Sequence, residues 1–212
     1  DTVAWYENDG NQVFTNHTLT TTADGAFSVF AIDVDGDGDI DVLSASVHDD
    51  TVAWYENDGS QGFTKHDITT SATSARSVFA IDLDGDNDTD VLSASLGDDT
   101  VAWYENNGNE VFTKHDITTS ALSARAVFAI DVDGDNDIDV LSASHNDDTV
   151  AWYENDGSQS FTKHVITTAV DSPRSIFAID MDGDNDIDVL SASYTDATIA
   201  WYENDGNQVF TK

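Results

Sequence analysis

The chain has no cysteine, one proline, one methionine and only seven lysine and arginine residues among its 212 residues. Without cysteine it has no disulfide framework. One proline beside thirteen glycines excludes collagen-like and proline-rich linker sequences. No apolar run approaches the ~18 residues that a membrane-spanning helix needs. Seven cations cannot form the basic face that nucleic acid or an anionic lipid surface requires, so we expect neither partner and no membrane insertion.

Acidic residues are abundant instead, and 42 aspartate and glutamate residues set a formal net charge of −35. Such a charge is typical of disordered chains. However, 39% of the residues are apolar, including five Trp, six Tyr and ten Phe, which is enough to bury a core. The chain begins at Asp1 without a basic start or an apolar segment, so we expect a mature piece or a fragment.

A 49-residue repeat organises the whole chain. The segment Asp1–Asn8 returns from Asp50, Asp99 and Asp148 and, slightly altered, from Ala197. Repeats of roughly 40 to 50 residues are typical of solenoids, arrays and propellers. We therefore treat 1–212 as a single repeat domain with two strands of a partial unit (1–25), three full repeats (26–74, 75–123 and 124–172) and a last repeat (173–212).

Four strands are predicted in each unit. In the first full unit they are residues 28–32, 41–46, 51–56 and 63–68, and an Asn57-Asp58-Gly59 turn joins the last two. No stretch shows the apolar periodicity of a helix, so the expected fold class is all-β. The first three strands have apolar side chains on both faces, as in Val52-Ala53-Trp54-Tyr55.

A sheet with two apolar faces must be covered on both, and without helices the cover must be further sheets. Four-stranded antiparallel blades stacked around an axis, a β-propeller, meet this requirement. The fourth strand of each unit is the most polar, which places it at the rim.

The most distinctive part of each unit follows its first strand. In the first full unit it reads Asp33-Val-Asp-Gly-Asp-Gly-Asp-Ile-Asp41, followed by Leu-Ser-Ala-Ser and the Trp-Tyr strand. This pattern resembles the FG-GAP/VCBS repeat family, which includes the integrin α-subunit propellers. The resemblance implies a propeller of usually about seven or eight blades, with calcium in the loops between the first and second strands.

The chain holds only about four blades' worth of strands, with five copies of the third strand. A four-blade ring closed within one chain would leave one of these strands unpaired. We therefore expect the ring to be completed by a second chain or by further repeats, so that the protein is a homo-oligomer or part of a longer repeat array.

Four acidic loops, 33–41, 82–90, 131–139 and 180–188, carry aspartate at every odd position. Neighbouring carboxylates repel one another by about 1 kcal/mol per pair at 4 Å even in water, so a cation is expected among them. Carboxylates with a backbone carbonyl at position seven suit Ca²⁺, one ion per loop and four per chain. The alternative is that the loops are solvated acidic turns.

Other metal-site classes fit the acidic loops less well. Strands flank them instead of helices, and serine replaces the final glutamate of an EF-hand. The absence of Cys and His from the loops argues against zinc. The candidate metal-binding residues are Asp33, Asp35, Asp37, Asp39, Asp41, Asp82, Asp84, Asp86, Asp88, Asp90, Asp131, Asp133, Asp135, Asp137, Asp139, Asp180, Asp182, Asp184, Asp186 and Asp188.

Three further sets of repeated side chains are expected to be structural. One histidine per unit at the rim should pair with a neighbouring Asp or Thr (His17, His66, His115 and His164). Arg76, Arg125 and Arg174 should pair with carboxylates or cap backbone carbonyls. The five tryptophans should lie in the core between blades; the alternative is an exposed row that stacks on sugars.

Differences between the units gather in two connections, the one between the second and third strands and the one before the first strand. Both should lie at the end of the blades opposite the acidic loops. Because recognition is often placed on loops of a rigid scaffold, this variable face is the predicted surface for a protein or glycan ligand. His48, His145 and Tyr194 are its candidate ligand-binding residues. Neutral drift in exposed loops predicts the same pattern.

The favoured function is a non-catalytic binding, adhesion or structural assembly module. Extracellular calcium modules bind with Kd on the order of 10⁻⁴ to 10⁻³ M, so we expect a secreted or cell-surface location. The alternatives are a glycan-binding lectin and a non-catalytic or catalytic part of a polysaccharide-degrading enzyme. Catalysis needs groups with different roles, whereas nearly every candidate acid, base or aromatic residue recurs in each unit, so no catalytic residue is predicted.

Overall fold

A computed structural model describes all 212 residues, and its only regular secondary structure is β-strand. It contains no helix, and therefore none long and apolar enough to cross a membrane. The strands are β1 (Val3–Asn8), β2 (Phe14–Thr20), β3 (Ala26–Ile32), β4 (Asp41–Ser46), β5 (Thr51–Asn57), β6 (Phe63–Thr69), β7 (Ala75–Ile81), β8 (Asp90–Ser95), β9 (Thr100–Asn106), β10 (Phe112–Thr118), β11 (Ala124–Ile130), β12 (Asp139–Ser144), β13 (Thr149–Asn155), β14 (Phe161–Thr167), β15 (Pro173–Ile179), β16 (Asp188–Ser193), β17 (Ile199–Asn204) and β18 (Phe210–Thr211).

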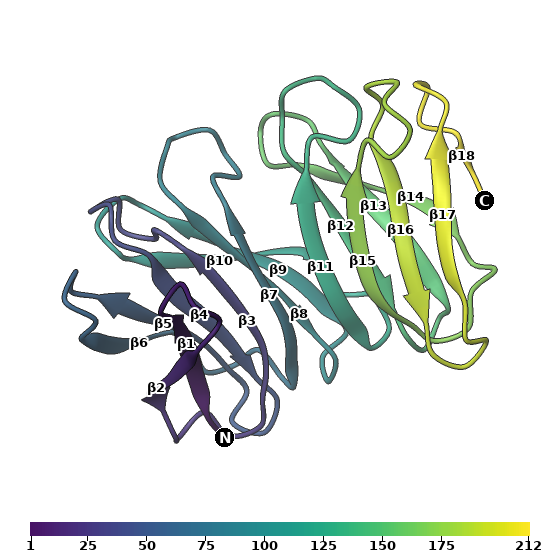
Figure 1. The fold of residues 1–212 in the computed structure, drawn as a ribbon. Coiled ribbons are helices and arrows are strands. Elements are labelled where there is room, and N and C mark those ends of the chain that lie inside the picture. The colour runs from purple at the N-terminus through teal and green to yellow at the C-terminus, as the bar shows by residue number, and fades with distance from the viewer.

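The strands form antiparallel meanders in which each strand pairs with its neighbours in the chain. Four sheets have four strands each, β3–β6, β7–β10, β11–β14 and β15–β18, and β1 and β2 form a separate pair. Figure 1 shows these sheets along an arc that runs from the N-terminal pair to the C-terminal blade. The prediction of a β-propeller built from four-stranded repeats is thereby confirmed, and the arc is not closed into a ring.

The first strand of every blade lies innermost. Strands β3, β7, β11 and β15 lie side by side (Figure 1). A row of phenylalanines joins them, with ring centroids 4.8 to 4.9 Å apart, namely Phe30, Phe79, Phe128 and Phe177. Because one equivalent residue from each blade forms the row, the uninterrupted 49-residue spacing keeps successive blades in the same register.

The hydrophobic core lies between successive blades, in three clusters of 12 buried residues each. In the first cluster Leu43 and Trp54 of one blade meet Val78 and Val91 of the next. The tryptophan prediction is confirmed for the three internal blades, where Trp54, Trp103 and Trp152 are buried. Trp201 of the last blade is 38% exposed because no further blade covers it.

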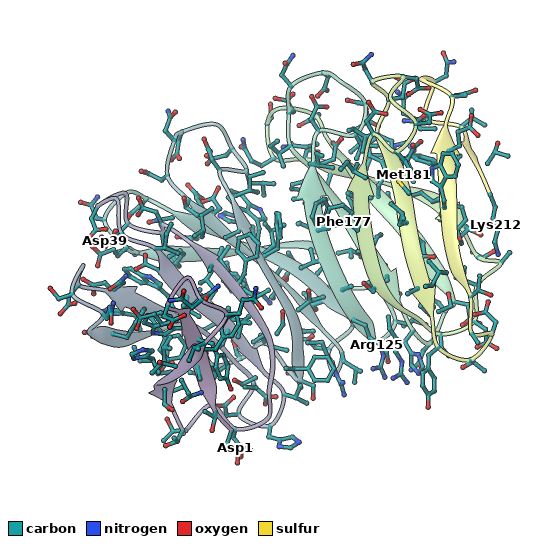
Figure 2. All side chains as sticks on the ribbon, in the orientation of Figure 1. Asp1, Asp39, Arg125, Phe177, Met181 and Lys212 are labelled. Carbon is teal, nitrogen blue, oxygen red and sulfur yellow. The ribbon has the colours of Figure 1, made fainter.

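The two variable connections meet at one end of each blade, as predicted. In the third blade the backbone N–H of His145 donates to the carbonyl of Ser123 at 3.2 Å, and that of Asn146 donates to Leu122 at 3.0 Å. The acidic loops and the hairpins between the third and fourth strands lie at the opposite end. In Figure 2 Met181, which belongs to the last acidic loop, lies at one end of the strands, and Arg125, near the start of β11, lies at the other end.

Candidate functional site

Each acidic loop is folded by its own carboxylates. In the third loop the carboxylate of Asp131 accepts backbone hydrogen bonds from Gly134 at 2.7 Å and Asn136 at 3.0 Å. These two donors lie in the left-handed region, with φ of 81° and 76°. Gly and Asn are the residues that adopt this conformation most readily, which explains their alternation at the sixth loop position.

This folding brings three carboxylates together in every loop. Their ligand oxygens lie within 4.8 Å of one another. Oxygens that bind one Ca²⁺ at about 2.4 Å can be at most about 4.8 Å apart, so each group fits around a single ion. The groups are Asp33, Asp35 and Asp37; Asp82, Asp84 and Asp86; Asp131, Asp133 and Asp139; and Asp180, Asp182 and Asp188.

The ninth loop position has a second role that the sequence pattern did not reveal. Asp139 is fully buried, and its two carboxylate oxygens accept backbone hydrogen bonds from Val132 and Asn155, both at 2.8 Å. Asn155 ends β13, so this carboxylate fastens the loop to the third strand of the blade. The equivalent residues Asp41, Asp90 and Asp188 make the same pair of bonds.

The seventh loop position points elsewhere. The carboxylate of Asp137 lies against Gly157 of the adjoining hairpin, where an added Cβ would come within 2.5 Å of it. Asp39, Asp88 and Asp186 are placed in the same way against their own hairpin glycines. These four side chains are absent from the groups of three, which leaves the backbone carbonyl as the donor expected at this position.

Burial and mutual repulsion raise several pKa values in the loops. The pKa of Asp139 rises from 3.8 to about 7, chiefly because the side chain is buried; its backbone hydrogen bonds oppose this, and the charges of Asp133 and Asp135 add to it. Asp90 is raised to about 7 for the same reasons. A cation among these carboxylates would stabilise their charged form. The all-oxygen donor set fits a hard divalent cation such as Ca²⁺.

The candidate ligand-binding residues do not form one group. The ring of His48 hydrogen-bonds to the carboxylate of Asp24 at 3.1 Å on the exposed surface. His145 and Tyr194 lie near Arg174 instead. The Arg174 guanidinium stacks 3.6 Å over the Tyr194 ring. Burial lowers the pKa of His145, and the charges of Arg125 and Arg174 lower it further.

Two expected structural pairings were wrong. The rim histidines pair with glutamate from the adjacent strand, as His115 does with Glu105 at 2.7 Å, and not with Asp or Thr. They also stack on tryptophan, with centroids 4.7 Å apart for Trp103 and His115, because the two residues face each other across the strand pair. None of the ion pairs involves an arginine, so Arg76 and its equivalents have no carboxylate partner.

Comparison with solved structures shows the fold. A periplasmic gluconolactonase from Pseudomonas aeruginosa superposes with a TM-score of 0.67 at 14% identity, over 100% of this chain and 62% of that one. The V. cholerae biofilm matrix protein Bap1 gives 0.59 at 16% identity, over 99% of this chain and 38% of that one. An exo-β-1,3-galactanase from Phanerochaete chrysosporium gives 0.53 at 12%, over 86% and 47%. The chain thus spans less than two thirds of each structure.

Sequence comparison is more specific. No curated protein sequence matches the chain. The FG-GAP-like repeat family, in contrast, matches residues 1–44, 33–93, 82–142 and 131–191 in tandem. These matches overlap at the acidic loops, so the last three each run from one candidate metal group to the next. The chain therefore belongs to the FG-GAP-like repeat family.

Proposed function

We propose that this chain is a calcium-stabilised, non-catalytic binding module of a secreted or cell-surface protein. The observation that carries the proposal is that each of the four acidic loops brings three carboxylates together, from loop positions 1, 3 and 5 in the first two loops and from positions 1, 3 and 9 in the last two. Four Ca²⁺ ions would change the formal net charge from −35 to −27 (−35 + 8) and would relieve repulsion where the carboxylates are most crowded. The non-catalytic part rests on the same repetition, because acid–base catalysis needs groups with different roles.

Calcium removal tests the proposal. With about 10 mM Ca²⁺ and a Kd of roughly 10⁻⁴ to 10⁻³ M, each site stabilises the fold by about 1.4 to 2.7 kcal/mol. Four sites together contribute roughly 6 to 11 kcal/mol, which corresponds to a rise in Tm of at least about 10 °C. Thermal melts in EDTA, in Ca²⁺ and in Mg²⁺ measure the change in Tm, and calorimetric titration measures the binding of Ca²⁺. An unchanged Tm in EDTA together with no heat of calcium binding contradicts the proposal.

A role in assembly is the second candidate, because apolar side chains that are covered at the internal interfaces are exposed beside the incomplete β1–β2 pair and on the last blade. Val29 is 59% exposed in the first full blade, whereas its equivalent Val127 is 5% exposed. In the last blade Ile199 is 83% and Trp201 38% exposed, whereas Trp103 is 2% exposed. These are the two faces that pack against each other at every internal interface, so a second copy of the chain would join head to tail.

Light scattering in calcium tests the assembly role. A dimer or larger oligomer that dissociates when Trp201 is replaced by glutamate is the expected result. The matched control is Tyr194→Glu, because Tyr194 is exposed on the same blade but lies at its variable end. A monomer at all concentrations, or an equal effect of both substitutions, contradicts a shared ring and leaves further repeats as the cover for these faces.

A glycan array separates the remaining functions. Saturable binding of several sugars per chain favours the lectin, and turnover of a polysaccharide favours the enzyme. The binding module and the assembly role both predict that no polysaccharide is turned over.

A further inference from the structure

Three of the seven cationic side chains occupy one unusual backbone position. Arg76, Arg125 and Arg174 are the second residues of β7, β11 and β15. At each of them the pairing with the next strand shifts register, between Ala75 and Ser77 in the second blade and in the same way in the other two. A β-bulge of this kind leaves the extra residue outside the ladder and redirects its side chain.

The bulges place the three arginines at the same end of neighbouring strands. The three strands are neighbours at the inner side of the arc, as the 4.9 Å spacing of their phenylalanine rings shows. The pKa of the Arg125 guanidinium is lowered, first by burial and then by the charges of Arg76 and Arg174. The pKa of Arg76 is also lowered by burial and by Arg174, two blades away. The three charges therefore act on one another at the variable end of the inner strands, where Figure 2 shows Arg125.

These arginines have no anionic partner in a chain with six times as many acidic as basic residues (42 against 7). All ion pairs of the chain are made by lysine or histidine. The Nε atoms of Arg76 and Arg125 are buried without a hydrogen-bond partner, and so is Nδ1 of His145 beside them. Guanidinium groups that have no acceptor within the chain favour a ligand that supplies acceptor oxygens to their accessible N–H groups.

The acidic loops do not cancel this local charge. They lie at the other end of the inner strands, and the seven residues of β11 extend for about 23 Å at about 3.3 Å per residue. That distance exceeds two Debye lengths of about 8 Å at physiological ionic strength. Nearer carboxylates face His145 from Asp148 and Asp171, and Asp148 is engaged by the backbone N–H of Ser172 at 2.9 Å.

We propose that Arg76, Arg125 and Arg174 form a binding site for an oxyanion group, a carboxylate or a sulfate, on the ligand of the variable face. The planar guanidinium offers paired N–H donors that match the oxygens of such a group. His145 lies at the edge of the site, and Tyr194 holds the Arg174 guanidinium from one side by stacking. In the first blade Phe27 occupies the bulge, so the site spans the second to fourth blades only. The inference rests on the proposed binding function and specifies the chemistry of its ligand.

Titration with sodium sulfate and sodium succinate, at constant ionic strength and in calcium, tests the site. The Nε–H signals of Arg76 and Arg125 in NMR spectra are the readout, because an anion held by the guanidinium groups changes the surroundings of these protons. Saturable shifts with both anions support the site, and a response to only one identifies the anion it takes. Linear shifts that do not saturate, or no shifts, overturn the inference.

Two variants make the test specific. Arg125→Gln should weaken anion binding at least tenfold, and Arg174→Gln, at an exposed position, should do the same if the first variant fails to fold. The control is Lys163→Gln on β14, which changes the net charge equally and removes no ion pair; it should change the affinity less than twofold. Equal effects of Lys163→Gln and Arg125→Gln overturn the inference. Calcium titration of each variant shows whether its calcium sites still bind the ion, so a loss of anion binding is distinguished from a loss of calcium binding.

Discussion

Replacing Asp139 with alanine should destabilise the protein even when no calcium is present. Asp139 is fully buried, and its carboxylate accepts the backbone N–H groups of Val132 and Asn155 at 2.8 Å each. The substitution leaves both donors buried without an acceptor, at about 1 to 3 kcal/mol each. The expected loss is therefore about 2 to 6 kcal/mol in the free energy of unfolding, or roughly 4 to 24 °C in Tm.

The control for this prediction is Asp135→Ala in the same loop. The Asp135 side chain is exposed, and its carboxylate accepts a single hydrogen bond, from the backbone of Asp137 at 2.9 Å. In EDTA at about pH 7.5 the control should lose less than about 1 kcal/mol. Denaturant unfolding followed by tryptophan fluorescence measures both variants. Equal losses in EDTA would refute the assignment of Asp139 as a structural acceptor, because the two residues would then differ only as calcium ligands.

Three further outcomes are expected. Burial raises the pKa of Asp90 and Asp139 from 3.8 to about 7, so between these values the folded ion-free protein holds protons that the unfolded chain releases. Its free energy of unfolding should therefore fall as the pH rises from about 4 to 7. Denaturant titrations in EDTA that show a rise in the free energy of unfolding over this range contradict the prediction. Trp103→Ala should cost about 3 to 5 kcal/mol and Trp201→Ala clearly less in the monomer, as thermal melts will show, since Trp103 is 2% and Trp201 38% exposed. Glu105→Gln should change stability by less than about 1 kcal/mol, because its pair with histidine is partly solvated; a larger loss would indicate a structural network at the rim.

Much of the fold was predictable because the repeat supplies the same evidence four times. Residues 41–46 were predicted as a strand and form β4, and residues 28–32 form most of β3. The two apolar faces of Val52-Ala53-Trp54-Tyr55 predicted sheets on both sides, and all four of these residues are buried. The two additional residues of β3, Ala26 and Phe27, belong to its bulge, and a bulge has no reliable signature in a single sequence.

The site was less predictable, because carboxylates in a regular sequence pattern take different roles once the loop folds. Asp137 and Asp139 are two residues apart, yet the first turns to a hairpin glycine and the second to buried backbone donors. The arginines were misassigned because the abundance of acidic residues favoured salt bridges. The small number of arginines and their recurrence at one position in three units were the available signals in the sequence. Only the structure shows that the Nε atoms of Arg76 and Arg125 lack acceptors.

The arc has a consequence for how the protein unfolds. The more extensive contacts between blades join adjacent blades only. The free energy of unfolding is therefore close to a sum of the stabilities of the single blades and of the interfaces between adjacent blades. The β1–β2 pair has one neighbouring blade and two strands, and it should therefore open first and exchange its amide hydrogens fastest. Amides of β11 and β12, with a blade on either side, should exchange slowest. Unfolding would then advance from the ends of the chain inward, in steps of one blade.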